Sequence, residues 1–375
     1  MAFLPIMRMS WTGVRAALCM TALVVLAGCT WFGSPVEQAV PGGAPGIATI
    51  GSGEITVGLI AADEPDNPAG GSANAVFIAA NMANDRTRDR PVRVLFRRYD
   101  GNPATLGAMA AEMVREGAKL VIGPDDPRAG PELAKALATS DVPVILLASD
   151  GGDSTGAVYA AGPSPQVEAS VIAAEMQTRG YKSIVLFADE SPTGRTLASL
   201  IAQSANNVGI AATTINAIDP PAARKQLDAL AGSGTMTSAI VFATNPEVAI
   251  RIMQEVHQVP ALADLPVVGN AVWAFRPPQA ALVGEGWYPA PAGNRLASFS
   301  SDFALMNGAA PTMNAAISHD LLVLAAVVPR IVNDPAVSYP REILTNDQGF
   351  TGVTGAFRFG ADGRSLRTLT ITELD

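Results

Sequence analysis

Cysteine and histidine are scarce in this sequence: its 375 residues include two of each. A zinc or iron–sulfur site built from these residues is therefore nearly excluded. Basic residues are also few, with 25 Lys and Arg against 34 Asp and Glu. The resulting net charge of -9 argues against nucleic-acid binding, which needs a basic surface to displace counterions. Hydrophobic residues make up 49% of the chain, which is ample for two folded lobes.

Several common catalytic motifs are missing as well. The sequence has no Walker-type phosphate loop, no G-x-G-x-x-G after a predicted strand and no H-E-x-x-H zinc motif. Asp125 and Asp126 form a carboxylate pair, but adjacent residues rarely face each other across a scissile bond. We therefore expect a binding protein and not an enzyme, without a metal or cofactor.

The first 28 residues have the pattern of an export signal. Arg8 and Arg15 precede an apolar run at residues 16–26, and no acidic residue occurs before Glu37. This run is shorter than the roughly 20 residues that span a bilayer, so a signal peptide is favoured over a transmembrane helix.

The end of the apolar run resembles the lipobox of bacterial lipoproteins. It reads Leu26-Ala27-Gly28-Cys29, and the resemblance implies cleavage after residue 28 and lipid on Cys29. The alternative is an ordinary signal peptide that happens to carry a cysteine. Cleavage there would remove Cys19 and two arginines but no acid, so the net charge of -9 would become -11. No free thiol would remain.

Residues 29–53 are predicted to be a flexible tether, because they are rich in Gly, Pro and small residues and lack periodicity. Thr30 follows the cysteine that would carry the lipid. By the enterobacterial sorting rule, the absence of Asp at this position favours anchoring in the outer membrane.

From Ile55 onward, short β-branched runs alternate with amphipathic segments. Such alternation predicts an α/β fold with parallel sheets flanked by helices. The predicted strands are 55–60, 92–99, 120–122, 144–148, 184–187, 210–215, 239–242 and 266–268. The predicted helices are 72–85, a segment around 106–114, 128–139 and 166–179. Two further β-rich runs, 350–359 and 366–371, flank the turn signal Asp362-Gly363 and predict a terminal hairpin added to one sheet.

Several segments together resemble the type I periplasmic-binding proteins, the Leu/Ile/Val-binding superfamily. These segments are Val57-Gly58-Leu59-Ile60, Gly117 to Pro124, Val142-Pro143-Val144-Ile145, Ser318-His319-Asp320 and Phe350 to Gly355 followed by Phe357-Arg358-Phe359. The resemblance covers the chain from Glu54 to its end. It implies a two-lobed type I periplasmic-binding fold with a hinge of three crossings, expected near Pro163, Trp273 and Phe350. The expected lobes are 54–162 with 275–349, and 163–274 with 350–375.

Within this superfamily the chain looks most like lipoproteins that activate penicillin-binding proteins. The supporting segments are the lipobox, Gly269 to Trp273, Gly286-Trp287-Tyr288 and the closing Phe357 to Arg367. This resemblance implies a periplasmic lipoprotein that regulates peptidoglycan synthesis by contact with a penicillin-binding protein. The rival is a receptor that delivers amino acids or related amides to an ABC permease. In both cases lipid would be the only contact with the membrane, a small solute could occupy the cleft, and no nucleic acid is expected.

Asp125 and Asp126 stand where the superfamily offers a hydroxyl and helix N-terminal amides to a ligand carboxylate. Two carboxylates there would repel an anionic group, although a cationic or neutral group could still bind. The alternative is that both residues merely cap the following helix.

Other cleft candidates are spread along the chain. Ser149 and Asp150 end a predicted strand, where the superfamily uses a Ser, but the segment also has turn composition. Asp189 and Thr193 follow another strand, where the family's Tyr is missing, and a capping role competes with ligand binding.

The last three candidates are Asn270, Trp273 and His319. Asn270 and Trp273 belong to the segment that resembles the activators, and Trp273 could also be hinge or core packing. His319 stands where the superfamily carries Tyr before Asp. It could line the cleft or titrate with pH, or it could be structural.

Overall fold

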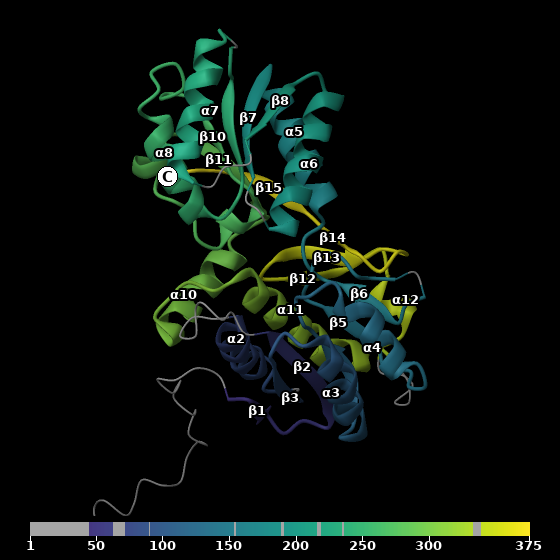
Figure 1. Ribbon diagram of the computed structural model, residues 1–375. Helices are drawn as coiled ribbons and strands as arrows, with labels where there is room; N and C mark the ends of the chain where they lie inside the picture. Colours follow the sequence, from purple (N-terminus) through teal and green to yellow (C-terminus); the bar gives the residue numbers. More distant parts are fainter. Residues whose placement is uncertain are drawn as a thin grey trace, which may run out of the picture. The chain divides into compact units, whose positions relative to one another are not determined.

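The computed structural model describes residues 45–62, 72–89, 91–153, 155–188, 191–215, 219–234, 236–332 and 339–375 (Figure 1). The predicted signal peptide, Cys29, the first part of the predicted tether and Asp189 lie outside these residues. No helix in the described ranges is long and apolar enough to cross a membrane.

The first lobe is built on a sheet whose described strands lie in the order β1-β3-β2-β4-β5-β6. Neighbouring strands pair in parallel, except β1, which is antiparallel to β3. The strands are β1 (Ile47–Ile50), β2 (Ile55–Ala62), β3 (Val92–Tyr99), β4 (Ala118–Ile122), β5 (Val144–Leu146) and β6 (Val158–Ala160). The helices are α2 (Ser72–Arg86), α3 (Pro103–Arg115), α4 (Ala129–Leu137), α10 (Arg295–Asn307), α11 (Met313–Val327), η2 (Val328–Arg330) and α12 (Arg341–Leu344).

Alternate side chains of β2 supply the two faces of this first sheet. Val57 and Leu59 pack with α2 and α11, whereas Ile60 packs with α3 and α4 on the other face. All three side chains are fully buried. Burial of such a side chain contributes about 1.5–3 kcal/mol, so helices on both faces stabilise the sheet. This explains why β2 is apolar along nearly its whole length.

The second lobe is built on a sheet with the strand order β15-β11-β10-β9-β7-β8. Only β15, at the edge, pairs antiparallel. The strands are β7 (Ser183–Ala188), β8 (Ala211–Ile215), β9 (Ala239–Ala243), β10 (Val267–Val268), β11 (Gly286–Pro291) and β15 (Leu369–Glu373). The helices are α5 (Pro165–Thr178), α6 (Pro192–Asn207), α7 (Pro220–Gly232), α8 (Pro246–Val256), η1 (Ala271–Ala274) and α9 (Ala280–Val283).

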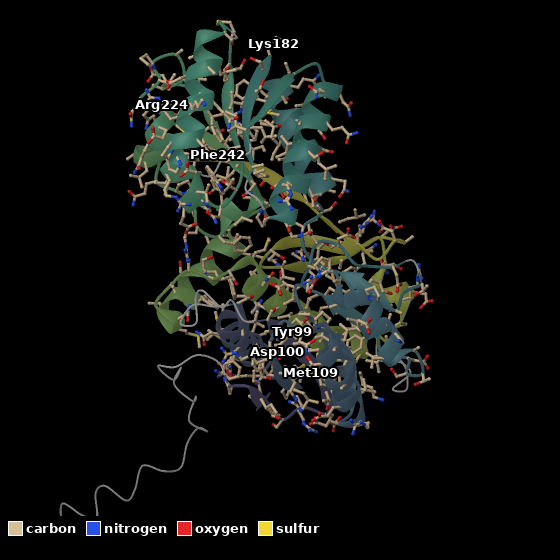
Figure 2. The ribbon with its side chains drawn as sticks, viewed as in Figure 1. Tyr99, Asp100, Met109, Lys182, Arg224 and Phe242 are labelled. Atoms are coloured by element: carbon tan, nitrogen blue, oxygen red, sulfur yellow. The ribbon has the colours of Figure 1, made fainter. Side chains whose placement is uncertain are left out.

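The core of the second lobe has two layers. Residues of α5 and α6 pack on one face of the sheet, and residues of α7 and α8 pack on the other. Phe242 of β9, labelled in Figure 2, stacks on Phe187 with 5.3 Å between ring centroids and on Trp273 with 6.1 Å. These aromatic contacts hold η1 against the sheet.

Four helices of the second lobe begin in the same way, with a capping residue followed by proline. The cap side chain accepts a hydrogen bond from the backbone N–H three residues later. Proline suits the first helical position, because its fixed φ is helical and its missing N–H would have no partner there. The pairs are Ser164-Pro165, Ser191-Pro192, Asp219-Pro220 and Asn245-Pro246.

A third, three-stranded sheet is formed by β12 (Phe350–Gly352), β13 (Gly355–Phe359) and β14 (Ser365–Arg367). Its Phe357 and Phe359 join the core of the first lobe. Asp320 of α11 is buried and accepts hydrogen bonds from the backbone N–H groups of Val353, at 2.7 Å, and Thr354, at 2.9 Å. This carboxylate fixes the turn between β12 and β13.

The predicted tether is wrong for its last residues, since β1 occupies Ile47–Ile50 and pairs with β3 over all four positions. The partner of this short strand lies far along the chain, so local composition could not indicate it.

The lobe boundaries also differ from the expectation. The chain passes from the first to the second lobe at residues 161–164, next to Pro163. It returns after β11 and not near Trp273, because β10 and β11 still belong to the second sheet. It passes again at Thr368, between β14 and β15, and not near Phe350. Two prolines within β11 concealed this strand in the sequence, since proline is unusual in a sheet.

The predicted terminal hairpin is present, because β13 and β14 pair antiparallel across Asp362-Gly363. It belongs to a separate three-stranded sheet, however, whose pairing with the first large sheet is limited, among the described residues, to a bridge between Ala160 of β6 and Arg364. The first β-rich run folds back on itself as β12 and β13, and the second run is divided between β14 and β15.

Candidate ligand-binding site

A cavity of about 320 Å³ lies between the two lobes. Its walls come from the segments that follow β4, β5, β6, β9 and β10, together with the first turns of α5, α6 and α11. In open α/β sheets, ligands bind beyond the carboxyl ends of the strands. This inter-lobe cavity is therefore placed where the topology predicts a ligand site.

Asp125 lines the inter-lobe cavity, as the sequence predicted. Its Oδ2 accepts a hydrogen bond of 2.7 Å from Nδ2 of Asn314, at the start of α11. Burial raises the pKa of the Asp125 carboxyl above its usual range, because the surroundings disfavour the charged form. Asp125 thus offers a partly desolvated acceptor to the cavity.

Asp126 does not line the cavity and is a correction to the prediction. Its carboxylate accepts a 2.9 Å hydrogen bond from the backbone N–H of Arg128 and pairs with the Arg128 guanidinium at 2.8 Å. These hydrogen bonds hold the pKa of Asp126 below its usual range. Arg128 therefore occupies Asp126 in the turn before α4, although no described side chain caps this helix, whereas the Asp125 carboxyl lines the cavity.

Ser149 and Thr193 line the cavity, but Asp150 does not. The Asp150 side chain is 61% exposed and pairs with Arg364 at 2.9 Å, which agrees with the turn alternative. In the α6 segment, Ser191 is the cap, because its Oγ accepts from the Gly194 N–H at 2.9 Å. Thr193 is exposed, and because Ser191 is the cap, the Thr193 side chain is not needed for capping.

Trp273 and His319 are further corrections. Trp273 is fully buried in the second-lobe core, where its Nε1 donates to the Thr244 carbonyl at 3.1 Å. His319 is buried in α11, makes a tilted ring contact with Phe299 at 4.9 Å and lines a separate pocket of the first lobe. Trp273 is thus held in the second-lobe core, and His319 faces a different pocket, so neither side chain lines the cavity.

Asn270 does line the cavity and is 5% exposed. Its Oδ1 is buried and has no hydrogen-bond partner among the described residues. A buried carbonyl oxygen without a donor costs about 1–3 kcal/mol, so a donor supplied by a ligand would be favourable there.

Glu168 is the site residue that the sequence reasoning missed. It lies in the first turns of α5, is 5% exposed and lines the cavity. Its Oε1 accepts a 2.7 Å hydrogen bond from the backbone N–H of Ala271, which links α5 to η1. Burial raises the pKa of Glu168 to about 7. An acidic residue near a helix start normally signals a solvated partner of the helix dipole, so the sequence carried no sign of burial.

Among the described residues, the ionisable side chains that line the cavity are all acidic. Of the described residues that line it, Asp125 and Glu168 are acidic, and none is Lys, Arg or His. Within the same described ranges, no group of three or more His, Cys, Asp or Glu could hold a metal ion. The other polar lining groups are hydroxyls and amides, which can orient a small molecule by hydrogen bonds.

Comparison with known proteins identifies the family. A family model described as periplasmic binding protein matches residues 54–375. The chain belongs to the periplasmic binding protein family. Its location in the periplasm follows from this membership, and the family is described as one of binding proteins. Comparison with curated protein sequences gives no significant match.

Solved structures of periplasmic binding proteins share the fold. A putative branched-chain amino acid ABC transporter protein from Rhodospirillum rubrum has a TM-score of 0.69 and 18% identity, covering 85% of this chain and 97% of its own. The branched-chain amino acid substrate-binding protein of Streptococcus pneumoniae, in complex with isoleucine, has a TM-score of 0.60 and 18% identity, with coverage of 84% and 95%. A solute-binding protein of an ABC transporter from Rhodopseudomonas palustris, in complex with 3,4-dihydroxybenzoic acid, has a TM-score of 0.64 and 13% identity. The match covers 86% of this chain and 93% of that protein.

The expected two-lobed type I fold is thus confirmed. The similar structures belong to proteins of ABC transporters, and at 13–18% identity they show that the fold is shared.

Proposed function

We propose that this periplasmic binding protein is the solute receptor of an ABC transporter and holds its ligand in the inter-lobe cavity. The observation that carries the proposal is the cavity itself. It is lined from the carboxyl ends of strands in both lobes, and its lining includes Asn270, whose buried Oδ1 has no hydrogen-bond partner among the described residues. Contact with another protein alone does not call for an unpartnered buried acceptor in a cavity wall.

The covalent links between the lobes suit ligand-dependent motion. The chain passes between them at 161–164, after Pro291 and at Thr368. Arg367, just before the last passage, is buried and donates two hydrogen bonds to the Ala161 carbonyl, of 3.1 and 2.7 Å. Two of the three passages are thereby held together, so relative motion of the lobes would be a hinge at a few backbone positions.

A cavity-filling substitution tests the proposal. Thr193→Trp should place an indole in the cavity without disturbing the core, because Thr193 is exposed on the first turn of α6. Thr196→Trp is the matched control, since Thr196 is exposed on the same helix but does not line the cavity.

The measurement is the thermal midpoint of the purified protein in the presence of a library of small metabolites. A ligand that raises the midpoint of the wild type and of Thr196→Trp, but not of Thr193→Trp, would support the proposal. Equal shifts in all three proteins would place the ligand elsewhere and refute it.

Regulation of a penicillin-binding protein stays a prediction from the sequence resemblance, as does the lipid anchor in the outer membrane. Capture of a peptidoglycan synthase from solubilised envelopes by the tagged wild type would support that function. Unchanged capture by Thr193→Trp would show that it does not use the cavity.

A further inference from the structure

We infer that the inter-lobe cavity is built for a small organic amine in its cationic form, and that it selects against ligands with a carboxylate. This inference rests on the proposed function and names the class of solute. It differs from the similar structures above, whose bound isoleucine and 3,4-dihydroxybenzoic acid both carry a carboxyl group.

The first support is that the Glu168 carboxyl is buried without a cationic partner among the described residues of the cavity lining. The Glu168 residue is only 5% exposed, and the one hydrogen bond that its carboxyl receives from a described residue comes from the Ala271 backbone N–H. No described cation lines the cavity beside it. Buried carboxylates are normally paired with a cation, because an isolated charge in a low-dielectric site is costly. A ligand ammonium group would supply the missing counter-charge.

The second support is independent of the carboxylates. Asn270 Oδ1 is a neutral acceptor that is buried, faces no described donor and belongs to a cavity-lining residue. A carboxylate could not satisfy this oxygen, since it has no proton to donate. An ammonium group has several N–H donors and could bond an amide oxygen and a carboxylate together.

The third support is that hydrogen-bond donors after β4 are already bonded to protein carboxylates. Asp126 already occupies the Arg128 backbone N–H and the Arg128 guanidinium, so neither is left for a ligand carboxylate. Asp125, the neighbouring residue, presents its own carboxyl to the cavity and keeps Asn314 Nδ2 engaged. An anionic ligand group on this side would meet like charge, whereas a cation would meet a partner.

An isosteric series tests the inference on the purified wild-type protein. Leucine carries both charged groups, 3-methylbutylamine is leucine without the carboxylate, and 4-methylpentanoate is leucine without the amine. The series is accompanied by a thermal screen of small amines, such as ethanolamine and putrescine, against an equal set of carboxylates and amino acids. We expect amines to raise the thermal midpoint, and 3-methylbutylamine to bind at least about tenfold more tightly than leucine in calorimetry.

Variants assign the effect to the cavity. Asp125→Asn and Glu168→Gln should each weaken amine binding about 10- to 100-fold, because each replaces a charge-assisted hydrogen bond between a carboxylate and the ammonium group by a bond to a neutral amide. Asp126→Asn, the matched control beside Asp125, should leave binding unchanged, because Asp126 lies outside the cavity wall. Unfolding curves of each variant establish that it is folded.

The outcomes separate this inference from the proposed function. Binding of carboxylates or leucine in preference to the amines would overturn the inference and leave the solute-receptor function standing. Amine binding that Asp126→Asn weakens as much as Asp125→Asn does would also overturn it. No thermal shift from either set would contradict both the inference and the proposed function.

Discussion

Replacing Glu168 by glutamine should change how the stability of the ligand-free protein depends on pH. Glutamine keeps an Oε1 acceptor for the Ala271 N–H but cannot ionise. In the wild type, burial raises the pKa of Glu168 from 4.5 to about 7. Between these values the folded state holds a proton that the unfolded state has released. The free energy of unfolding should therefore fall as the pH rises from 4.5 and level off above 7.

The size of the effect follows from the two pKa values. At about 1.4 kcal/mol for each pH unit, the interval between 4.5 and about 7 corresponds to about 3 kcal/mol. Other titrating groups are common to both proteins and largely cancel in the difference between them. The stability of Glu168→Gln relative to the wild type should thus rise by about 3 kcal/mol from pH 4.5 to pH 7.5.

Urea unfolding followed by tryptophan fluorescence at several pH values measures this difference. Glu132→Gln is a suitable control, because Glu132 is exposed on α4, and its difference from the wild type should stay nearly constant. If the difference for Glu168→Gln is also independent of pH, the buried carboxyl titrates alike in the folded and unfolded states, and the expected pKa shift is wrong.

Three further predictions concern other parts of the chain. Cys29→Ala should abolish lipid processing, so the variant should leave the membrane fraction in a salt wash; retention at unchanged mature size would contradict the anchor. Asp320→Ala should lower the free energy of unfolding by about 3–5 kcal/mol in urea, because it removes the buried acceptor of the Val353 and Thr354 amides. Trp273→Phe should cost about 1–3 kcal/mol by leaving the Thr244 carbonyl without its donor, yet ligand affinity should change little; a large loss of affinity would place Trp273 in the site after all.

Periodicity in the sequence predicted much of the fold, because most strands and helices form from local patterns. The expected strand at 92–99 coincides with β3, and the expected helix at 72–85 with α2. The errors are at elements whose partners are distant. β1 forms by pairing with β3, and β11 is a strand despite two prolines because β10 and β15 flank it.

The sequence also predicted part of the cavity lining, because some of its residues stand at positions that local patterns reveal. Asp125, Ser149, Thr193 and Asn270 follow strands or begin helices, and such positions converge at the strand ends of an α/β sheet. Glu168 could not be found in this way, because its burial depends on η1, which lies about a hundred residues later in the chain and covers α5. Asp126 and Asp150 are each paired with an arginine outside the cavity wall. Asp126 pairs with the nearby Arg128, whereas Asp150 pairs with Arg364, which is distant in the sequence and could not be anticipated from local composition.

A crystal structure of the protein with a ligand from the thermal screen shows directly whether the cavity between the lobes is the ligand site. We expect electron density for the ligand in contact with Asp125, Glu168 and Asn270. Density for the ligand at any other place, with no ligand in the cavity, would mean that the cavity is not the binding site.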